Sequence, residues 1–446
     1  MKMKRVISFT RVSSLILWFS GSLVLSAFAD KPARQWFGSQ YSQSHEPVTL
    51  SLDEAISVAL RDNRRILLNQ EKLNQTLLKI EEARGAFLPE VNLKGGSDYT
   101  RGFYKKDILN YSFQAGLKQY LYKGGKSVNT LKQNQYKKEI QQAVLEENIL
   151  ETLSRVKKAF WTLLFSREFS RLNQKILENR KLHLETYLER YNKGEASESD
   201  LLKAKSELAQ AEYLYEASLN QAQSAMTLFK NLLYLEENTQ IEIKGALEYL
   251  PREIAVDEAM LQALSLRPEI KQYEFQQKAD NLGVEIARAD NRPSIYTTLD
   301  YYSKSTTSLT FSPGKGWQDY NIAAIVLSWP VFDGWITKSK VEQAISTLKQ
   351  DKIMEGQLKR DIAAEAKSAY VSLKTALSRL EPKKRDLELG QDALNTIQAK
   401  YQAGILSELD LKDAQAALAV SSFNQEQAVY ECLLARVELD QATGVK

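Results

Sequence analysis

The sequence reads YNKGEASESDL at residues 191–201 and YQAGILSELDL at residues 401–411. The two segments share a tyrosine, a glycine, a serine, a glutamate, an aspartate and a leucine at identical spacing, 210 residues apart. The same shift aligns YKG at residues 122–124 with FDG at residues 332–334. A period of about 200 residues is too long for a solenoid repeat, so it indicates one supersecondary unit that the chain contains twice.

Long helices precede and follow each of these segments. No glycine or proline lies between Gly125 and Gly194, and apolar residues recur there at intervals of three and four among Lys, Glu, Gln and Asn. This pattern predicts one long amphipathic helix, followed by a second over 197–235. The second copy predicts the same pair over 334–401 and 407–443. A hairpin of two helices is too thin to enclose a hydrophobic core, so its apolar residues must pack on other helices, as they do in coiled coils.

A shorter helix opens each copy of the unit. The first is expected over 51–87, where Ser51 and Glu54 have the spacing of a capping box. Its counterpart is expected to begin at Val256 and to end before Pro293. In the long helix of the second copy we expect a kink or a break at Pro382, because proline removes a backbone donor and clashes with the preceding turn.

Between the short and long helices the apolar period changes from helical to alternating, at about 90–122 and about 294–331. Strands of about ten residues with one apolar face suit a transmembrane β-barrel, although a soluble hairpin packed on helices explains the alternation equally well. The polar segments 100–110 and 304–319 favour exposed hairpin tips, and thereby the barrel. Four strands cannot close a barrel, so a membrane-spanning sheet would require oligomerisation, and three copies would give twelve strands and a usable bore.

Bulk properties exclude several functions. Residues 1–29 have a basic start, an apolar stretch and a small-residue cleavage pattern, which predicts a secretory signal peptide. The remaining chain has 56 basic and 56 acidic residues, so no nucleic-acid partner is expected. Cys432 is the only cysteine and lies in an apolar helix, where a buried, inert thiol is expected. With two histidines, His45 and His183, and no recognisable nucleophile or nucleotide loop, we expect no catalytic site, no metal site and no cofactor.

The order of elements and three motifs carry a resemblance to a known family. The motifs are LRPEI at 266–270, WPVFDG at 329–334, and YQAG at 401–404 followed by DLKDA at 410–414. Across nearly the whole mature chain this arrangement resembles the TolC-like outer-membrane efflux family. The resemblance implies a mainly α-helical homotrimer, whose twelve-stranded transmembrane β-barrel receives four strands from each chain and continues as a long periplasmic α-helical barrel.

The same resemblance implies a function and a set of partners. The chain would be the exit duct of a tripartite efflux or type I secretion system for drugs, metals or proteins. It would contact outer-membrane lipid, a periplasmic adaptor and an inner-membrane pump of the RND, ABC or MFS type. We expect the chain to consist of a signal peptide (1–29), an N-terminal extension (30–50), a first repeat (51–245) and a second repeat (246–443).

The duplicated turns are expected at the periplasmic tip of the helical barrel. The resemblance makes them adaptor-contact candidates, through Gly194, Ser197, Gly404 and Ser407. A local explanation is also available, since the glycines suit left-handed helix C-caps and each serine has an aspartate three residues later, as in a capping box.

Acidic residues of the last helix are the candidate pore constriction. The resemblance implies that Asp410 and Asp413 ring the tunnel entrance, and that Asp200 and Tyr401 belong to a network that closes it. Leu406 stands where the family commonly has a latch arginine, which argues against a charged latch. Two acids three residues apart share one helix face, and a trimer would gather six of them, which should attract cations. A solvated helix face remains the alternative for Asp413.

The competing functional class is a periplasmic or secreted coiled-coil scaffold that forms no pore. The strands distinguish the two classes, because a scaffold has no need of four strands with continuous apolar faces.

Overall fold

The computed structural model describes residues 48–103, 106–251, 254–305 and 316–446. The predicted signal peptide (1–29) and most of the predicted extension (30–50) therefore lie outside the described residues. Most of the described chain is helical. No helix within these ranges is both long enough and apolar enough to cross a bilayer.

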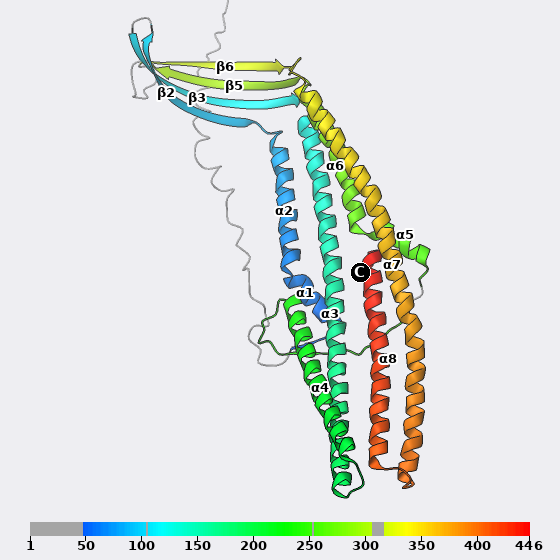
Figure 1. Ribbon diagram of the computed structural model, residues 1–446. Helices are drawn as coiled ribbons and strands as arrows, with labels where there is room; N and C mark the ends of the chain where they lie inside the picture. Colours follow the sequence, from blue (N-terminus) through cyan, green and yellow to red (C-terminus); the bar gives the residue numbers. More distant parts are fainter. Residues whose placement is uncertain (1–47, 104–105, 252–253, 306–315) are drawn as a thin grey trace, which may run out of the picture. The chain divides into compact units, whose positions relative to one another are not determined.

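Two long helical hairpins contain the duplicated turns (Figure 1). The first pairs α3 (Lys126–Asn192) with α4 (Glu198–Leu232), and the second pairs α7 (Ile336–Gln402) with α8 (Glu408–Thr443). Helices α3 and α7 each have 67 residues. The hairpins contact one another through α3 and α8. The four long helices predicted from apolar periodicity are thus confirmed, within a few residues at each end.

The short opening helices are each split in two, which corrects the prediction of single helices. The pieces are α1 (Leu52–Asp62), α2 (Arg64–Gly85), α5 (Val256–Leu266) and α6 (Pro268–Ala289). Asn63 has an extended backbone, and its side-chain oxygen caps α2 by accepting from the N–H groups of Arg65 and Ile66. Arg267 is extended because the following residue is Pro268, which disfavours helical geometry in its predecessor.

Helix α7 continues through Pro382, so the expected break does not occur. Proline removes the hydrogen bond to the carbonyl of Ser378, and both residues are exposed, so water can solvate that carbonyl. On the opposite side of the helix Leu373 and Leu380 are buried against α8 and its neighbours. Packing along this stripe holds the helix together across the lost bond.

The four predicted strands form one antiparallel sheet in the order β2-β3-β5-β6 (Figure 1). They are β2 (Glu90–Phe103), β3 (Lys106–Lys123), β5 (Ser294–Ser305) and β6 (Trp317–Ser328). The expected loop at 100–110 is largely strand, because the β2–β3 pairing continues to Phe103 and Lys106. A small parallel sheet of β1 (Val48–Leu50) and β4 (Ile241–Ile243) was not predicted, since three-residue strands leave too little periodicity.

Candidate functional site: the strand sheet and the helical tip

One face of the four-stranded sheet is apolar and open. The register aligns Val91, Leu117 and Leu299 in one row across three adjacent strands. Leu299 is 55% exposed, and Ile325 on β6 is 76% exposed. A continuous apolar surface of this kind on a monomeric soluble protein would be unusual, and it marks a surface that contacts lipid or another chain.

The opposite face of the sheet is polar. Gln114 donates to the Asp300 carboxylate at 3.1 Å and to the Tyr302 hydroxyl at 3.0 Å. Gly116 makes room for this group, because a Cβ at that position would lie 2.5 Å from Asp300 Oδ1. Nearer the helices, the Lys118 ammonium lies 4.3 Å from the centre of a tyrosine ring on β5. One face of the sheet can therefore form hydrogen bonds with water, whereas the other face is apolar.

A charged cluster joins the sheet to the long helices. Asp290, just after α6, accepts from Lys126 at the start of α3 at 2.6 Å and from Lys340 at the start of α7 at 2.9 Å. Hydrogen bonds from these lysines hold the pKa of Asp290 below its usual value. The strand-to-helix turn at Gly124 has a φ of +61°, and a Cβ there would lie 2.8 Å from the carbonyl oxygen of Ala289. Sequence reasoning missed this cluster, because its three charged members are far apart in the chain.

The tip turns have the expected left-handed glycines. Gly194 has a φ of +78° and Gly404 a φ of +73°. In each turn the next residue donates back into the helix, to Arg190 at 2.8 Å and to Lys400 at 3.0 Å. These bonds satisfy carbonyls that a helix end would otherwise leave free.

Both predicted capping boxes are present. The Ser407 hydroxyl lies 2.6 Å from Asp410 Oδ2 and accepts from the Asp410 N–H at 3.2 Å. Ser197 and Asp200 have the same bonds at 2.7 and 3.2 Å. Hydrogen bonds from the serine side chain and backbone lower the pKa of each aspartate. Local capping thus accounts for the position of both carboxylates.

The predicted closure pair is not joined within the protomer. The hydrogen bonds of Asp200 in the described chain go to Ser197 and not to Tyr401. Tyr401 lies in the last turn of α7 with 38% of its surface exposed. A network through these two residues stays a prediction, and it would require a neighbouring protomer or a different state of the tip.

Asp413 has partners that sequence reasoning did not foresee. Its Oδ1 contacts His183 Nε2 and accepts from Asn179 at 3.3 Å, and both partners lie on α3. The side chain of His183 is 12% exposed and that of Asp413 is 47% exposed. No sequence signal links these residues, because they are 230 positions apart. Asp410 and Asp413 are therefore on one helix, but the first serves the cap and the second faces the other hairpin.

Aromatic rings join α3 to α8 closer to the middle of the helices. Phe165 stacks on Tyr430 with ring centres 4.5 Å apart and on Phe423 at 5.2 Å. The Tyr430 hydroxyl lies 3.0 Å from the Thr162 hydroxyl. This contact fixes the two hairpins against one another within the protomer.

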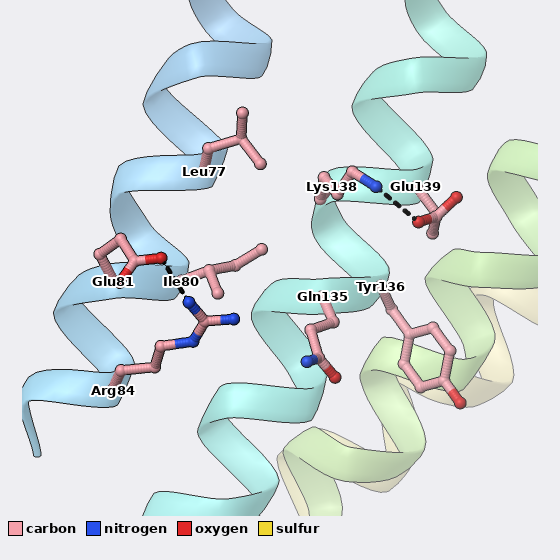
Figure 2. Close-up of a pocket in the computed structure, with 8 residues that line it drawn as sticks. All are labelled: Leu77, Ile80, Glu81, Arg84, Gln135, Tyr136, Lys138 and Glu139. Atoms are coloured by element: carbon pink, nitrogen blue, oxygen red, sulfur yellow. Dashed lines mark hydrogen bonds and ion pairs between the residues drawn. The ribbon is translucent and has the colours of Figure 1, made fainter. Parts of the chain in front are cut away.

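A groove lies between α2 and α3 (Figure 2). It has a volume of about 480 Å³. Figure 2 shows its charged side chains already paired, Glu81 with Arg84 at 2.6 Å and Lys138 with Glu139 at 3.1 Å. Groups that satisfy one another in this way leave no unpaired charge directed at a ligand. Within the described residues, no group of three or more His, Cys, Asp or Glu side chains is arranged to hold a metal ion.

The model of the family described as outer membrane efflux protein matches residues 55–232 and 260–445. The chain belongs to the outer membrane efflux protein family. As a member of this family it is an outer-membrane channel for efflux, which confirms the resemblance drawn from its motifs.

Individual relatives of this outer membrane efflux protein are distant but cover most of it. It is 26% identical to the probable outer membrane lipoprotein SilC of Salmonella typhimurium, over 83% of this chain and 81% of SilC. It is 21% identical to the outer membrane protein TolC of Vibrio cholerae, over 89% of this chain and 94% of TolC. The CmeC outer membrane channel of Campylobacter jejuni has the same fold, with a TM-score of 0.74 at 15% identity over 88% of this chain and 85% of CmeC.

Proposed function

We propose that this efflux channel is the passive exit duct of a tripartite efflux or type I secretion system. Three copies would form a twelve-stranded barrel in the outer membrane, continued into the periplasm by a barrel of long helices. The observation that carries this proposal is the open, amphipathic four-stranded sheet. Energy for transport would come from a partner, so the chain itself needs no catalytic site.

The sheet edges support oligomerisation. In the described sheet, β2 and β6 are the two outer strands. An unpaired strand edge in lipid leaves backbone N–H and C=O groups without partners, at a cost of several kcal/mol for each group. Pairing β2 of one protomer with β6 of the next would satisfy both edges. Twelve strands would leave a bore, whereas eight would be filled by side chains.

The division into two repeats, 51–245 and 246–443, supports the helical part of the proposal. Each repeat would contribute one hairpin, so a trimer would assemble six hairpins around one axis. The turns at Gly194 and Gly404 would then lie at the periplasmic end, where an adaptor protein would contact them and Ser197 and Ser407. An inner-membrane pump of the RND, ABC or MFS type would complete the assembly.

Asp410 and Asp413 are the proposed cation-binding constriction. The lowered pKa of Asp410 keeps its carboxylate ionised at neutral pH, and its hydrogen bonds to Ser407 leave it at the start of α8, near the turn. Asp413 retains 47% exposure although its Oδ1 is engaged. Both carboxylates can therefore contribute negative potential at a narrow entrance.

Single-channel recording in planar bilayers tests the proposal. The purified trimer should conduct, and Asp413→Lys should lower cation selectivity and weaken block by multivalent cations. Lys203→Glu is a matched control, because Lys203 occupies the equivalent position in the first repeat. A pure trimer that never conducts would favour the scaffold function. Unchanged selectivity in Asp413→Lys would remove Asp413 from the constriction.

A further inference from the structure

His183 occupies a distinctive place in the described part of the molecule. It lies on α3 in the tip half of the first hairpin and contacts the Asp413 carboxylate on α8 of the second hairpin. Asn179, one turn earlier on α3, donates to the same oxygen at 3.3 Å. The His183 ring also stacks on Tyr187 with ring centres 6.4 Å apart. Two polar groups of one hairpin thus converge on one carboxylate of the other.

The surrounding interface changes character along the helices. Aromatic stacking through Phe165 and Tyr430 holds α3 on α8 nearer the sheet. The buried residues of α8 in the described structure lie between Ala428 and Thr443, away from the tip. Beyond the aromatic rings, α3 and α8 line a polar groove of about 550 Å³. Its polar lining includes Lys175, Glu178 and Asn179 of α3, and Glu408, Lys412 and Gln415 of α8.

The interface between α3 and α8 therefore has two parts, an aromatic contact that stays in place and a polar contact nearer the tip that can be released. Aromatic packing does not depend on pH, whereas the interface nearer the tip is lined by polar side chains and contains the two bonds to Asp413. Asp413 is bonded to α3 beside this groove, which its partner Asn179 also lines. The hairpins can therefore splay at the tip without disrupting the aromatic contact, provided that the Asp413 bonds break.

We propose that His183 and Asp413 form a pH-sensitive link between the two hairpins of each protomer, and that its release accompanies opening of the tip. This inference rests on the proposed channel function and adds a residue, His183, that regulates it. The link is intramolecular, so it acts in each protomer whether or not a latch between protomers exists. Asn179 donates to the same Asp413 oxygen and forms the second bond of this link.

The sign of the pH effect follows from the charges. A protonated imidazole facing an ionised aspartate forms a charge-assisted hydrogen bond, which is stronger than the bond from a neutral imidazole. Histidine is the side chain whose charge ordinarily changes between pH 5 and 8. Acidification within this window should therefore strengthen the link and favour the closed tip. A difference between a charged and a neutral hydrogen bond corresponds to about a fivefold change in the ratio of linked to released protomers.

Several other charged groups lie near the pair. Arg180 of α3 pairs with Glu207 of α4 at 3.5 Å, within the first hairpin. Helix α7, on the far side of α8, has Lys400 in its last turn. Further charged residues on these segments are Lys175, Glu178, Lys181, Glu185 and Arg190 on α3, and Glu408, Asp410 and Lys412 on α8. The His183→Gln variant, which removes the imidazole, decides whether a response between pH 5 and 8 comes from His183.

Spin-label distance measurement between the two turns tests the link directly. Cysteines would replace Glu195 and Ala403 in one protomer of otherwise unlabelled trimers, and the buried Cys432 would stay unlabelled. In the otherwise native chain the short-distance population should rise about fivefold relative to the long one between pH 8 and pH 5.5. His183→Gln and Asp413→Asn should each abolish this pH response while the trimer remains intact.

Arg180→Gln is the control, because it breaks an ion pair inside one hairpin and should keep the response. A native chain whose turn distance does not change with pH would overturn the proposal, and so would a His183→Gln variant that keeps the response. The distance measurement does not require conduction. A pH response without any channel current would therefore support the His183–Asp413 link and contradict the channel function. Channel current without a pH response would support the channel function and contradict the link.

Discussion

The capping boxes of the duplicated turns allow a sharp test of what holds the tip. Ser407→Ala removes a hydroxyl that lies 2.6 Å from the Asp410 carboxylate and accepts from its N–H at 3.2 Å. Loss of a serine N-cap ordinarily costs about 1 kcal/mol, which is about a fivefold increase in local opening. The Ser407 backbone N–H still donates to Asp410 at 2.8 Å, so the carboxylate stays near its position.

Hydrogen–deuterium exchange of the assembled protein measures this opening. Amides in the first turn of α8 should exchange about fivefold faster in Ser407→Ala, whereas those near Cys432, in the buried half of the helix, should not change. Ser197→Ala is the matched variant, because the hydrogen bonds of Ser197 have nearly the same lengths as those of Ser407. It should speed exchange in the first turn of α4 by a similar factor. Because Asp410 keeps its charge, cation selectivity should be unaltered.

The reasoning would be refuted by either of two results. Unchanged exchange in the first turn of α8 would mean that the cap contributes nothing, and that other contacts of the assembled tip hold the helix start. Faster exchange along the whole of α8 would mean that Ser407 supports the packing of the helix and not its end.

Three further predictions concern stability and reactivity. Phe165→Leu removes two aromatic pairs, including that with Tyr430, so chemical denaturation should show a loss of about 1–3 kcal/mol per protomer. Burial, together with a hydrogen bond to Asp351, raises the pKa of Asp280 to about 6. The protonated carboxyl therefore stabilises the folded protein at acidic pH, and this stabilisation is lost as the pH rises through 6. Asp280→Asn should therefore raise the melting temperature more at pH 8 than at pH 5. Burial raises the pKa of the Cys432 thiol to about 11, so a maleimide reagent should modify it only after denaturation.

Local chemistry made much of the fold predictable. An unbroken run without glycine or proline predicted α3, and the serine caps predicted the starts of α4 and α8. Alternation predicted all four strands of the larger sheet. One failure arose where a single residue redirects the chain, as Asn63 does between α1 and α2, and of the kink or break predicted at Pro382 the break does not occur. Propensity describes a residue and its neighbours, whereas both outcomes depend on what the surrounding faces contact.

By itself, the sequence determined the extent of the four long helices and the chemistry of the two turns, because each depends on residues within a few positions of one another. Its motifs also led to the efflux family. Only the tertiary structure decided that Asp290 joins the starts of α3 and α7, and that Asp413 faces His183. Those pairings depend on how α3 lies against α8 and on where α6 ends, and no local pattern encodes the meeting of residues 50 or more positions apart.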